Sequence, residues 1–106
     1  MTVIVVLFNL RPGVAAADYE AWARNTDLPI VRNLASIADF YVGRTVQRLG
    51  SDEPAPYAYV EVVKVKDMAQ FGADVESETM QRVSTEFQHW ADDPVFMVTQ
   101  SLEGQD

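Results

Sequence analysis

The sequence predicts one α+β domain in which strands and helices follow each other in the order β-α-β-β-α-β. Three observations lead to this prediction: an apolar, β-branched segment opens the chain, two later segments have helical periodicity, and two strand-like segments lie between those helices. The chain has 106 residues, which fits a single domain over residues 1–106 and leaves no room for two. This order is the ferredoxin-like arrangement, in which helices cover one face of an antiparallel sheet.

The first strand and the first helix occupy the N-terminal third. Thr2–Leu10 is apolar almost throughout, so both of its faces should be covered. Arg11–Gly13 forms a turn, and from Val14 the apolar positions follow helical spacing. Pro29 disfavours helix at the residue before it, so the helix should end or kink there, with a further turn or two over residues 30–34. The expected buried stripe consists of Tyr19, Trp22, Ala23 and Thr26.

Two strands joined by a polar connection are expected in the middle of the chain. Ile37–Leu49 alternates between apolar and polar positions over its length, and Tyr57–Val65 does so as well. The segment between them, Gly50–Pro56, is polar and contains prolines. The two strands should therefore form a hairpin.

Two helices are expected before the last strand. Asp67 opens a short helix with Gln70 three residues later, as in a capping box, and Gly72 should end it. A longer helix follows from about Ser77 to Ala91. Its apolar stripe consists of Met80, Val83, Phe87 and Trp90.

The last strand completes a sheet with one uncovered face. The segment Asp92–Pro94 should stop the helix, and Val95–Leu102 should form the strand. Right-handed crossovers place both helices on the same face of the sheet. The opposite face would still be apolar, and a monomer rarely exposes such a patch. We therefore expect a homodimer that packs sheet against sheet, a dimeric α/β barrel.

Composition excludes several classes of function. The formal net charge is −8, from 16 acidic and 8 basic residues, so the basic surface that nucleic-acid or membrane binding requires is missing. There is no cysteine and only one histidine, so typical zinc, copper or iron–sulfur sites lack ligands. We expect no cofactor and no metal, with haem ligation by His89 as the alternative. The lack of cysteine also fits a cytoplasmic location.

Three segments carry a resemblance to a known family. They are Asp27–Arg32 (DLPIVR), Ser36–Phe40 (SIADF) and Phe87–Phe96 (FQHWADDPVF), and they resemble the RedY-like proteins of the dimeric α/β-barrel superfamily. The resemblance covers nearly the whole chain. It implies a pocket between sheet and helices and an accessory role in the biosynthesis of prodiginine pigments or related pyrrole and indole metabolites. It also suggests a cyclising or dehydrating step on a keto-acid or amino-ketone intermediate.

His89 and Glu61 are the candidate catalytic residues. Histidine is the most frequent general base near neutral pH, although His89 could equally be a half-exposed residue that suits a helix C-terminus. Glu61 lies inside an apolar strand. If its face is the one covered by helices, its carboxyl should have a raised pKa and could act as an acid or base; on an edge strand it would be a solvated charge.

Six further residues are candidates for binding the substrate. Polar residues on barrel strands either line a cavity or cross-link the dimer, and the dimer is the stronger interpretation for Arg44. Aromatic side chains could form a wall for a flat heteroaromatic ligand, although most such residues only pack in the core. Asn25, like Asp27, could alternatively terminate the first helix. The six are Asn9, Trp22, Asn25, Arg44, Tyr59 and Trp90.

Three hypotheses about function follow. The favoured one is a cofactor-free enzyme in which His89 moves a proton while Glu61 or Asn9 orients a small pyrrole, indole or keto-acid intermediate, which then cyclises, dehydrates or tautomerises. The second is a cofactor-free monooxygenase that acts on an electron-rich aromatic compound. The third is a carrier protein that holds a pathway intermediate without transforming it.

Overall fold

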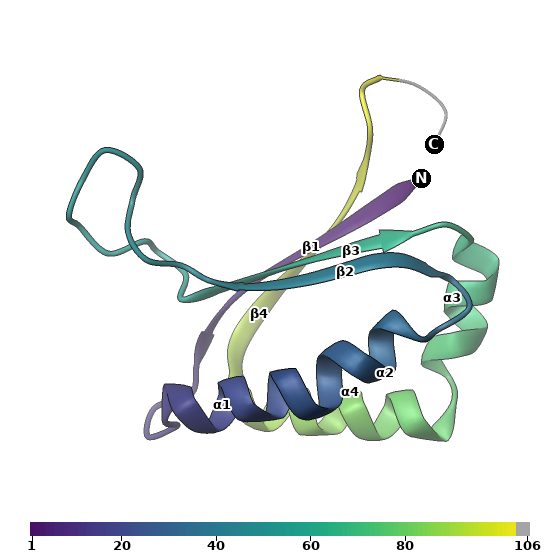
Figure 1. The fold of residues 1–106 in the computed structure, drawn as a ribbon, viewed down its shortest axis with the longest axis horizontal. Coiled ribbons are helices and arrows are strands. Elements are labelled where there is room, and N and C mark those ends of the chain that lie inside the picture. Colours follow the sequence, from purple (N-terminus) through teal and green to yellow (C-terminus); the bar gives the residue numbers. More distant parts are fainter. Residues whose placement is uncertain (104–106) are drawn as a thin grey trace.

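A computed structural model describes residues 1–103 of the chain, so residues 104–106 of the expected domain lie outside the described part. The order of strands and helices confirms the predicted α+β fold, with all helices below one face of the sheet in Figure 1. The elements are β1 (Thr2–Leu10), α1 (Ala16–Trp22), the π-helical turn η1 (Ala23–Asp27), α2 (Leu28–Arg32), β2 (Ile37–Arg44), β3 (Tyr59–Val65), α3 (Met68–Val75), α4 (Glu78–Trp90) and β4 (Ala91–Gln100).

The sheet has the strand order β2-β3-β1-β4, and every neighbouring pair is antiparallel. The predicted hairpin of β2 and β3 is confirmed, and β1 lies between β3 and β4. Antiparallel strands in this order, with crossover helices on one face, are the ferredoxin-like fold that the sequence predicts.

The first helix does not end at Pro29. It continues without a break from α1 through η1 into α2, and the Leu28 N–H donates to the Ala23 carbonyl five residues earlier. A proline ring clashes with the carbonyl four residues before it in a regular α-helix, and the wider π turn removes that conflict. The turn also moves the buried side of the helix by one residue. Asp27 is buried, whereas Thr26, expected on the buried stripe, is only half-buried.

The hairpin strands are shorter than predicted. β2 ends at Arg44 and β3 begins at Tyr59, and the connection over residues 45–58 projects from the body of the molecule (Figure 1). Pro54 and Pro56 have no N–H group, so they cannot continue the hydrogen-bond ladder of the sheet. The residues from 45 to 49 therefore continue the alternation of apolar and polar side chains but are not part of β2.

The prediction that Gly72 ends the short helix is wrong. α3 continues through Gly72 to Val75, because a glycine inside a helix costs only about 1 kcal/mol relative to alanine. The predicted start is confirmed, since the Asp67 side chain accepts a hydrogen bond of 3.0 Å from the Gln70 N–H.

β4 begins earlier than predicted, directly where α4 ends. The sequence places its start at Val95, but pairing with β1 already begins at Ala91. Asp93, with φ of 46°, and Pro94 lie in an irregularity of the pairing, where no ladder donor is needed from the proline. The predicted stripe of α4 is confirmed: three of its members are buried and one is half-buried.

The two faces of the sheet differ in cover. On the helix-covered face, alternate residues of β1 are buried in the core: Ile4, Val6 and Phe8. On the other face a continuous apolar row crosses all four strands through paired positions, and no part of the described chain lies over it (Figure 1). This row consists of Tyr41, Val62, Val5 and Met97. Tyr41 is 54% exposed.

Candidate functional site

The larger cavity of the molecule lies between the sheet and the helices and has a volume of about 580 Å³. Side chains from β1, β2, β3 and β4 form one wall, and side chains from η1, α2, α3 and α4 form the other. Most of them are aliphatic or aromatic, and the exposed residues Phe96 and Val98 of β4 lie at its open side. A cavity of this size and character can enclose a small organic molecule.

Glu61 presents a carboxyl group to this cavity from β3. Alternate residues of the strand, Tyr59, Glu61 and Val63, are buried on the helix-covered face. The same register places Val42 of β2 and Val6 of β1 opposite Glu61, so its strand neighbours on both sides are apolar. This is the arrangement for which the sequence predicts a raised pKa.

Asp27 presents a second carboxyl group to the same cavity from the π turn. It is buried, and its side chain is hydrogen-bonded to that of Glu61. A carboxylate can only accept hydrogen bonds, so one of the two groups must be protonated to donate to the other. The pair therefore holds one proton between two carboxyl groups.

Burial raises the pKa of both groups. It raises the pKa of Asp27 to about 6, against a hydrogen bond from Glu61 that acts in the opposite direction. The pKa of Glu61 is raised well above its ordinary value, first by burial and then by the neighbouring Asp27 charge. As the pH rises, Asp27 releases its proton before Glu61 does, so while the pair holds one proton a base and an acid lie side by side. Such a pair can remove a proton at one position of a bound molecule and supply one at another.

Two buried polar atoms at the pair lack a partner. Glu61 Oε2 and the Tyr19 hydroxyl have no hydrogen-bond partner among residues 1–103. Burial and the charges of Glu61 and Asp27 raise the pKa of Tyr19, so its hydroxyl stays protonated beside the pair. Unsatisfied buried groups cost free energy and are uncommon in folded proteins, so their presence here marks a position for a polar ligand atom or water.

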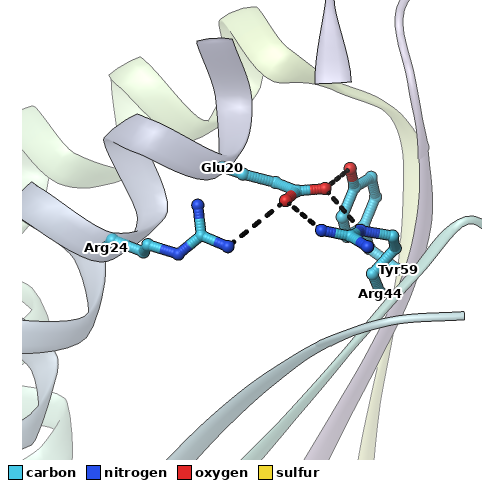
Figure 2. A network of polar contacts seen from close by, with 4 residues as sticks. All are labelled: Glu20, Arg24, Arg44 and Tyr59. Atoms are coloured by element: carbon cyan, nitrogen blue, oxygen red, sulfur yellow. Dashed lines mark hydrogen bonds and ion pairs between the residues drawn. The ribbon is translucent and has the colours of Figure 1, made fainter. Parts of the chain in front are cut away.

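A smaller hollow of about 170 Å³ lies beside the pair, between α1 and the β2–β3 hairpin. Its polar centre is Glu20, whose carboxylate accepts hydrogen bonds of 2.7 and 2.8 Å from Arg44 and of 2.7 Å from the Tyr59 hydroxyl (Figure 2). Arg24 lies 3.5 Å away. These contacts lower the pKa of Glu20 to about 2, with the Arg44 hydrogen bonds as the largest cause. Glu20 is therefore a fixed anion with its partners already in place.

The structure separates the two candidate catalytic residues. Glu61 lies in the larger cavity, whereas His89 is exposed on α4 and lines neither of these two hollows. Asn9, suggested as an orienting group, is exposed at the end of β1. Its side chain accepts from the Ala58 N–H at 2.9 Å and donates to the Pro56 carbonyl at 3.2 Å, which ties the hairpin connection to β1.

The remaining predicted binding residues lie outside the larger cavity. Trp22 and Trp90 pack on each other with ring centroids 6.2 Å apart, and the Trp22 indole donates to Glu86 at 2.8 Å. Asn25 is exposed on the π turn. Arg44 and Tyr59 line the smaller hollow, where both bind Glu20 within the chain.

Sequence reasoning did not select Asp27 as a functional residue and treated it as a possible helix terminator. A spacing of four connects Tyr19, Ala23, Asp27 and Val31, all of which are buried. That spacing, together with the proline two residues after Asp27, is the sequence signal that could have identified the inward-facing carboxyl. The inward orientation of Asp27 can be predicted from this spacing only if the helix is assumed to contain a π turn.

Two further features are absent from residues 1–103. Within residues 1–103, no group of three or more histidine, aspartate or glutamate side chains is placed to hold a metal ion. Within the same residues, no helix combines the length and apolar character needed to cross a bilayer.

Comparisons with known proteins agree with the fold. Residues 2–102 match the family described as REDY-like protein HapK. The crystal structure of HapK from Hahella chejuensis is 30% identical, with a TM-score of 0.79, and the match covers 100% of this chain and 97% of that one. A comparison with curated proteins finds no match.

Two enzymes of known activity share the fold at low identity. The hydroxynitrile lyase from Passiflora edulis is 12% identical with a TM-score of 0.79, and the match covers 99% of this chain and 96% of that one. A variant of SnoaB, a cofactor-independent oxygenase from Streptomyces nogalater, is 13% identical with a TM-score of 0.75, over 97% and 94% of the two chains. At such identities the likeness concerns the fold alone.

Proposed function

Since this chain belongs to the family of REDY-like protein HapK, we propose that it is a cofactor-free accessory enzyme of secondary metabolism, of the kind that serves prodiginine-like pigments. It binds a small pyrrole- or indole-bearing intermediate and promotes its cyclisation, dehydration or tautomerisation by proton transfer. The observation that carries this proposal is the Asp27–Glu61 pair, which shares one proton at the wall of an apolar cavity. The pigment assignment rests on the family resemblance, and the proton transfer rests on the pair.

The proposed chemistry uses both members of the pair at once. Ionised Asp27 removes a proton from a carbon next to a carbonyl or imine group of the bound molecule. Protonated Glu61 gives its proton to the oxygen or nitrogen on which negative charge develops, which completes a tautomerisation without a net change of charge. Loss of water or ring closure can follow from the enol or enamine. The apolar walls shield the reactive intermediate from water.

A surrogate reaction tests the pair without the natural substrate. In 5-nitrobenzisoxazole, a base removes the C–H proton while the ring N–O bond breaks, and a coloured cyanophenolate forms. We expect the protein to accelerate this reaction at pH 7.5, because a carboxylate in an apolar cavity is a stronger base than one in water. Asp27→Asn and Glu61→Gln should each lower the rate by roughly 10²-fold, the lower end of general acid–base effects.

Two control variants make the outcome specific. Glu53→Gln removes an exposed carboxyl of the hairpin connection, and His89→Ala removes the only imidazole; both should keep the wild-type rate. If the wild type binds the probe without accelerating its elimination, the carrier hypothesis replaces the enzyme, and if the pair variants keep an accelerated rate, the pair is not the base. If His89→Ala alone abolishes the rate, the general base is His89.

We also propose that the protein is a homodimer that packs sheet against sheet. The support is the apolar row of Tyr41, Val62, Val5 and Met97, which crosses the face of the sheet that helices leave uncovered. An isologous dimer would bury this row against its own copy. Such burial is the usual explanation for an apolar patch on a small protein.

Light scattering coupled to size-exclusion chromatography tests the dimer. The wild type should elute at twice the mass of one chain, and Val62→Arg should shift it to the mass of one chain, because each copy would place a charge in the apolar contact. Thr85→Arg adds the same charge on an exposed site of α4 and should leave the dimer intact. A wild type that elutes as a monomer at all concentrations would overturn the proposal.

A further inference from the structure

The charge of the larger cavity points to a class of ligand that its size and shape alone do not define. Among the described residues that line it, Asp27 and Glu61 are the only ionisable ones, and the other polar side chains of the lining, Ser84 and Gln88, are neutral. With one proton shared between two carboxyl groups, the pair carries a single negative charge. The lining contributes no positive charge to balance it.

The two arginines that line the neighbouring hollow already interact with Glu20. Arg44 forms two hydrogen bonds with Glu20, and Arg24 lies 3.5 Å from the same carboxylate (Figure 2). Both arginine side chains are mostly exposed, at 63% and 67%, so they point their charge toward solvent and Glu20. The charge of the Asp27–Glu61 pair therefore lacks a counter-charge from this side.

The pair also has more acceptors than donors. Its four oxygen atoms share one proton, and Glu61 Oε2 has no donor within the described part of the chain. A buried carboxyl oxygen without a donor is stabilised by a ligand that brings an N–H group, and more so if that group is positively charged. A ligand carboxylate would instead bring a second negative charge next to the first in an apolar environment.

We propose that the larger cavity selects flat apolar molecules that present an N–H donor to Glu61 and Asp27, that it binds the cationic form of such a group most tightly, and that it rejects organic carboxylates. This inference rests on the proposed function, because it takes the same cavity and the same pair as the site. It favours an amine-, imine- or amidine-bearing intermediate over a free keto acid. The keto-acid substrate that the resemblance suggests would have to lose or mask its carboxylate before it binds.

Three probes of nearly equal shape separate charge from fit: naphthalene-2-carboxamidine (a cation), naphthalene-2-carboxamide (neutral) and naphthalene-2-carboxylate (an anion). Titration calorimetry at pH 7.5 should rank them in that order for the wild type. We expect the amidine to bind at least tenfold more tightly than the amide, which corresponds to about 1.4 kcal/mol. The carboxylate should bind at least tenfold more weakly than the amide.

The double variant Asp27→Asn/Glu61→Gln keeps the shape of the pair and removes its charge. In this variant the amidine should lose its advantage over the amide. Glu53→Gln is the matched control, since it removes an exposed carboxyl of the hairpin connection that lines neither hollow, and it should leave the ranking unchanged. Circular dichroism would confirm that each variant is folded.

Two results would overturn this inference and leave the proposed function standing. One is that the carboxylate binds as tightly as the amide and inhibits the elimination of 5-nitrobenzisoxazole. The other is that none of the three probes binds while that elimination still depends on Asp27 and Glu61. Loss of the dependence on the pair would instead contradict the proposed function itself.

Discussion

Two carboxyl sites lie next to each other on the same helix and the same strand, and their pKa values move in opposite directions. Glu20 of α1 meets Tyr59 of β3, and its pKa is lowered to about 2. Asp27 of η1 meets Glu61, further along the same strand, and both pKa values are raised. The residue type is nearly the same at the two sites, so the environment alone determines which carboxyl is a fixed anion and which can exchange a proton.

The strand register explains the difference. Arg44 of β2 pairs with Tyr59, and its guanidinium reaches Glu20 from there. Two positions along, the partner of Glu61 on β2 is Val42. The outer site, Glu20, thus has a cation as its neighbour. The inner site, Asp27 and Glu61, has a valine as its neighbour, so only the shared proton offsets its negative charge. The outer site serves as a structural clamp and the inner one as a candidate for chemistry.

The largest expected effect concerns the inner pair and the pH dependence of stability. Because folding raises the pKa values of Asp27 and Glu61, the folded state holds protons that the unfolded chain has released above about pH 4. The free energy of unfolding should therefore fall as the pH rises from about 4 through 6 and beyond. Over this range the decline caused by the pair should be on the order of a few kcal/mol. Glu61→Gln should flatten this dependence and stabilise the protein at pH 8.

Urea denaturation at pH 5 and pH 8, at one fixed protein concentration, measures the effect. Glu53→Gln removes an exposed carboxyl and one unit of net charge, so it controls for general charge repulsion and should keep the wild-type slope. The Tyr19 hydroxyl, whose pKa is raised by burial and by Glu61 and Asp27, is unchanged in both variants. If the free energy of unfolding fell equally between pH 5 and pH 8 in the wild type and in Glu61→Gln, the Asp27–Glu61 pair would not be the cause of the pH dependence. The contrast between the two carboxyl sites would then be wrong.

Much of the fold could be predicted from periodicity, because it follows from burial. The stripe of α4, the cap at Asp67 and the apolar core of β1 depend on local sequence, and the structure confirms them. The end of β2 could not be predicted from the alternation of residues 37–49. Strand pairing requires a partner, and the prolines of the connection remove the donors that would provide one.

The site was less predictable, because it depends on one turn of helix. The sequence did not decide whether Glu61 lies on the helix-covered face or is exposed to solvent, since a shift of one residue in register moves a side chain to the other face. Asp27 was overlooked because a regular helix of 3.6 residues per turn puts Thr26 on the buried stripe. Only the extra residue of η1 rotates Asp27 toward Glu61. His89 was chosen for its chemistry, and residue type alone cannot show that a side chain lies outside a cavity.

The smaller effect is expected at the outer site, and with the opposite pH dependence. A carboxyl whose pKa is lowered in the folded state stabilises the protein above its unfolded pKa of about 4.5 and loses that contribution as the pH falls toward 2. Glu20→Gln should thus destabilise the protein at pH 7 and have little effect near pH 2. The loss should be about 1 kcal/mol and not more, because Arg44 is 63% exposed and water and salt screen the ion pair.

Measurement at low and high salt separates the two contributions to this site. In 1 M sodium chloride the effect of Glu20→Gln should shrink, since screening removes much of the attraction to Arg44 but leaves the hydrogen bond from the Tyr59 hydroxyl. Tyr59→Phe removes that hydrogen bond and should be insensitive to salt. If Glu20→Gln instead destabilised the protein equally at pH 7 and near pH 2, the carboxylate would act through packing rather than charge. Glu20 would then stabilise the protein by packing, and its contrast with Asp27 and Glu61 would not be a difference in the direction of a pKa shift.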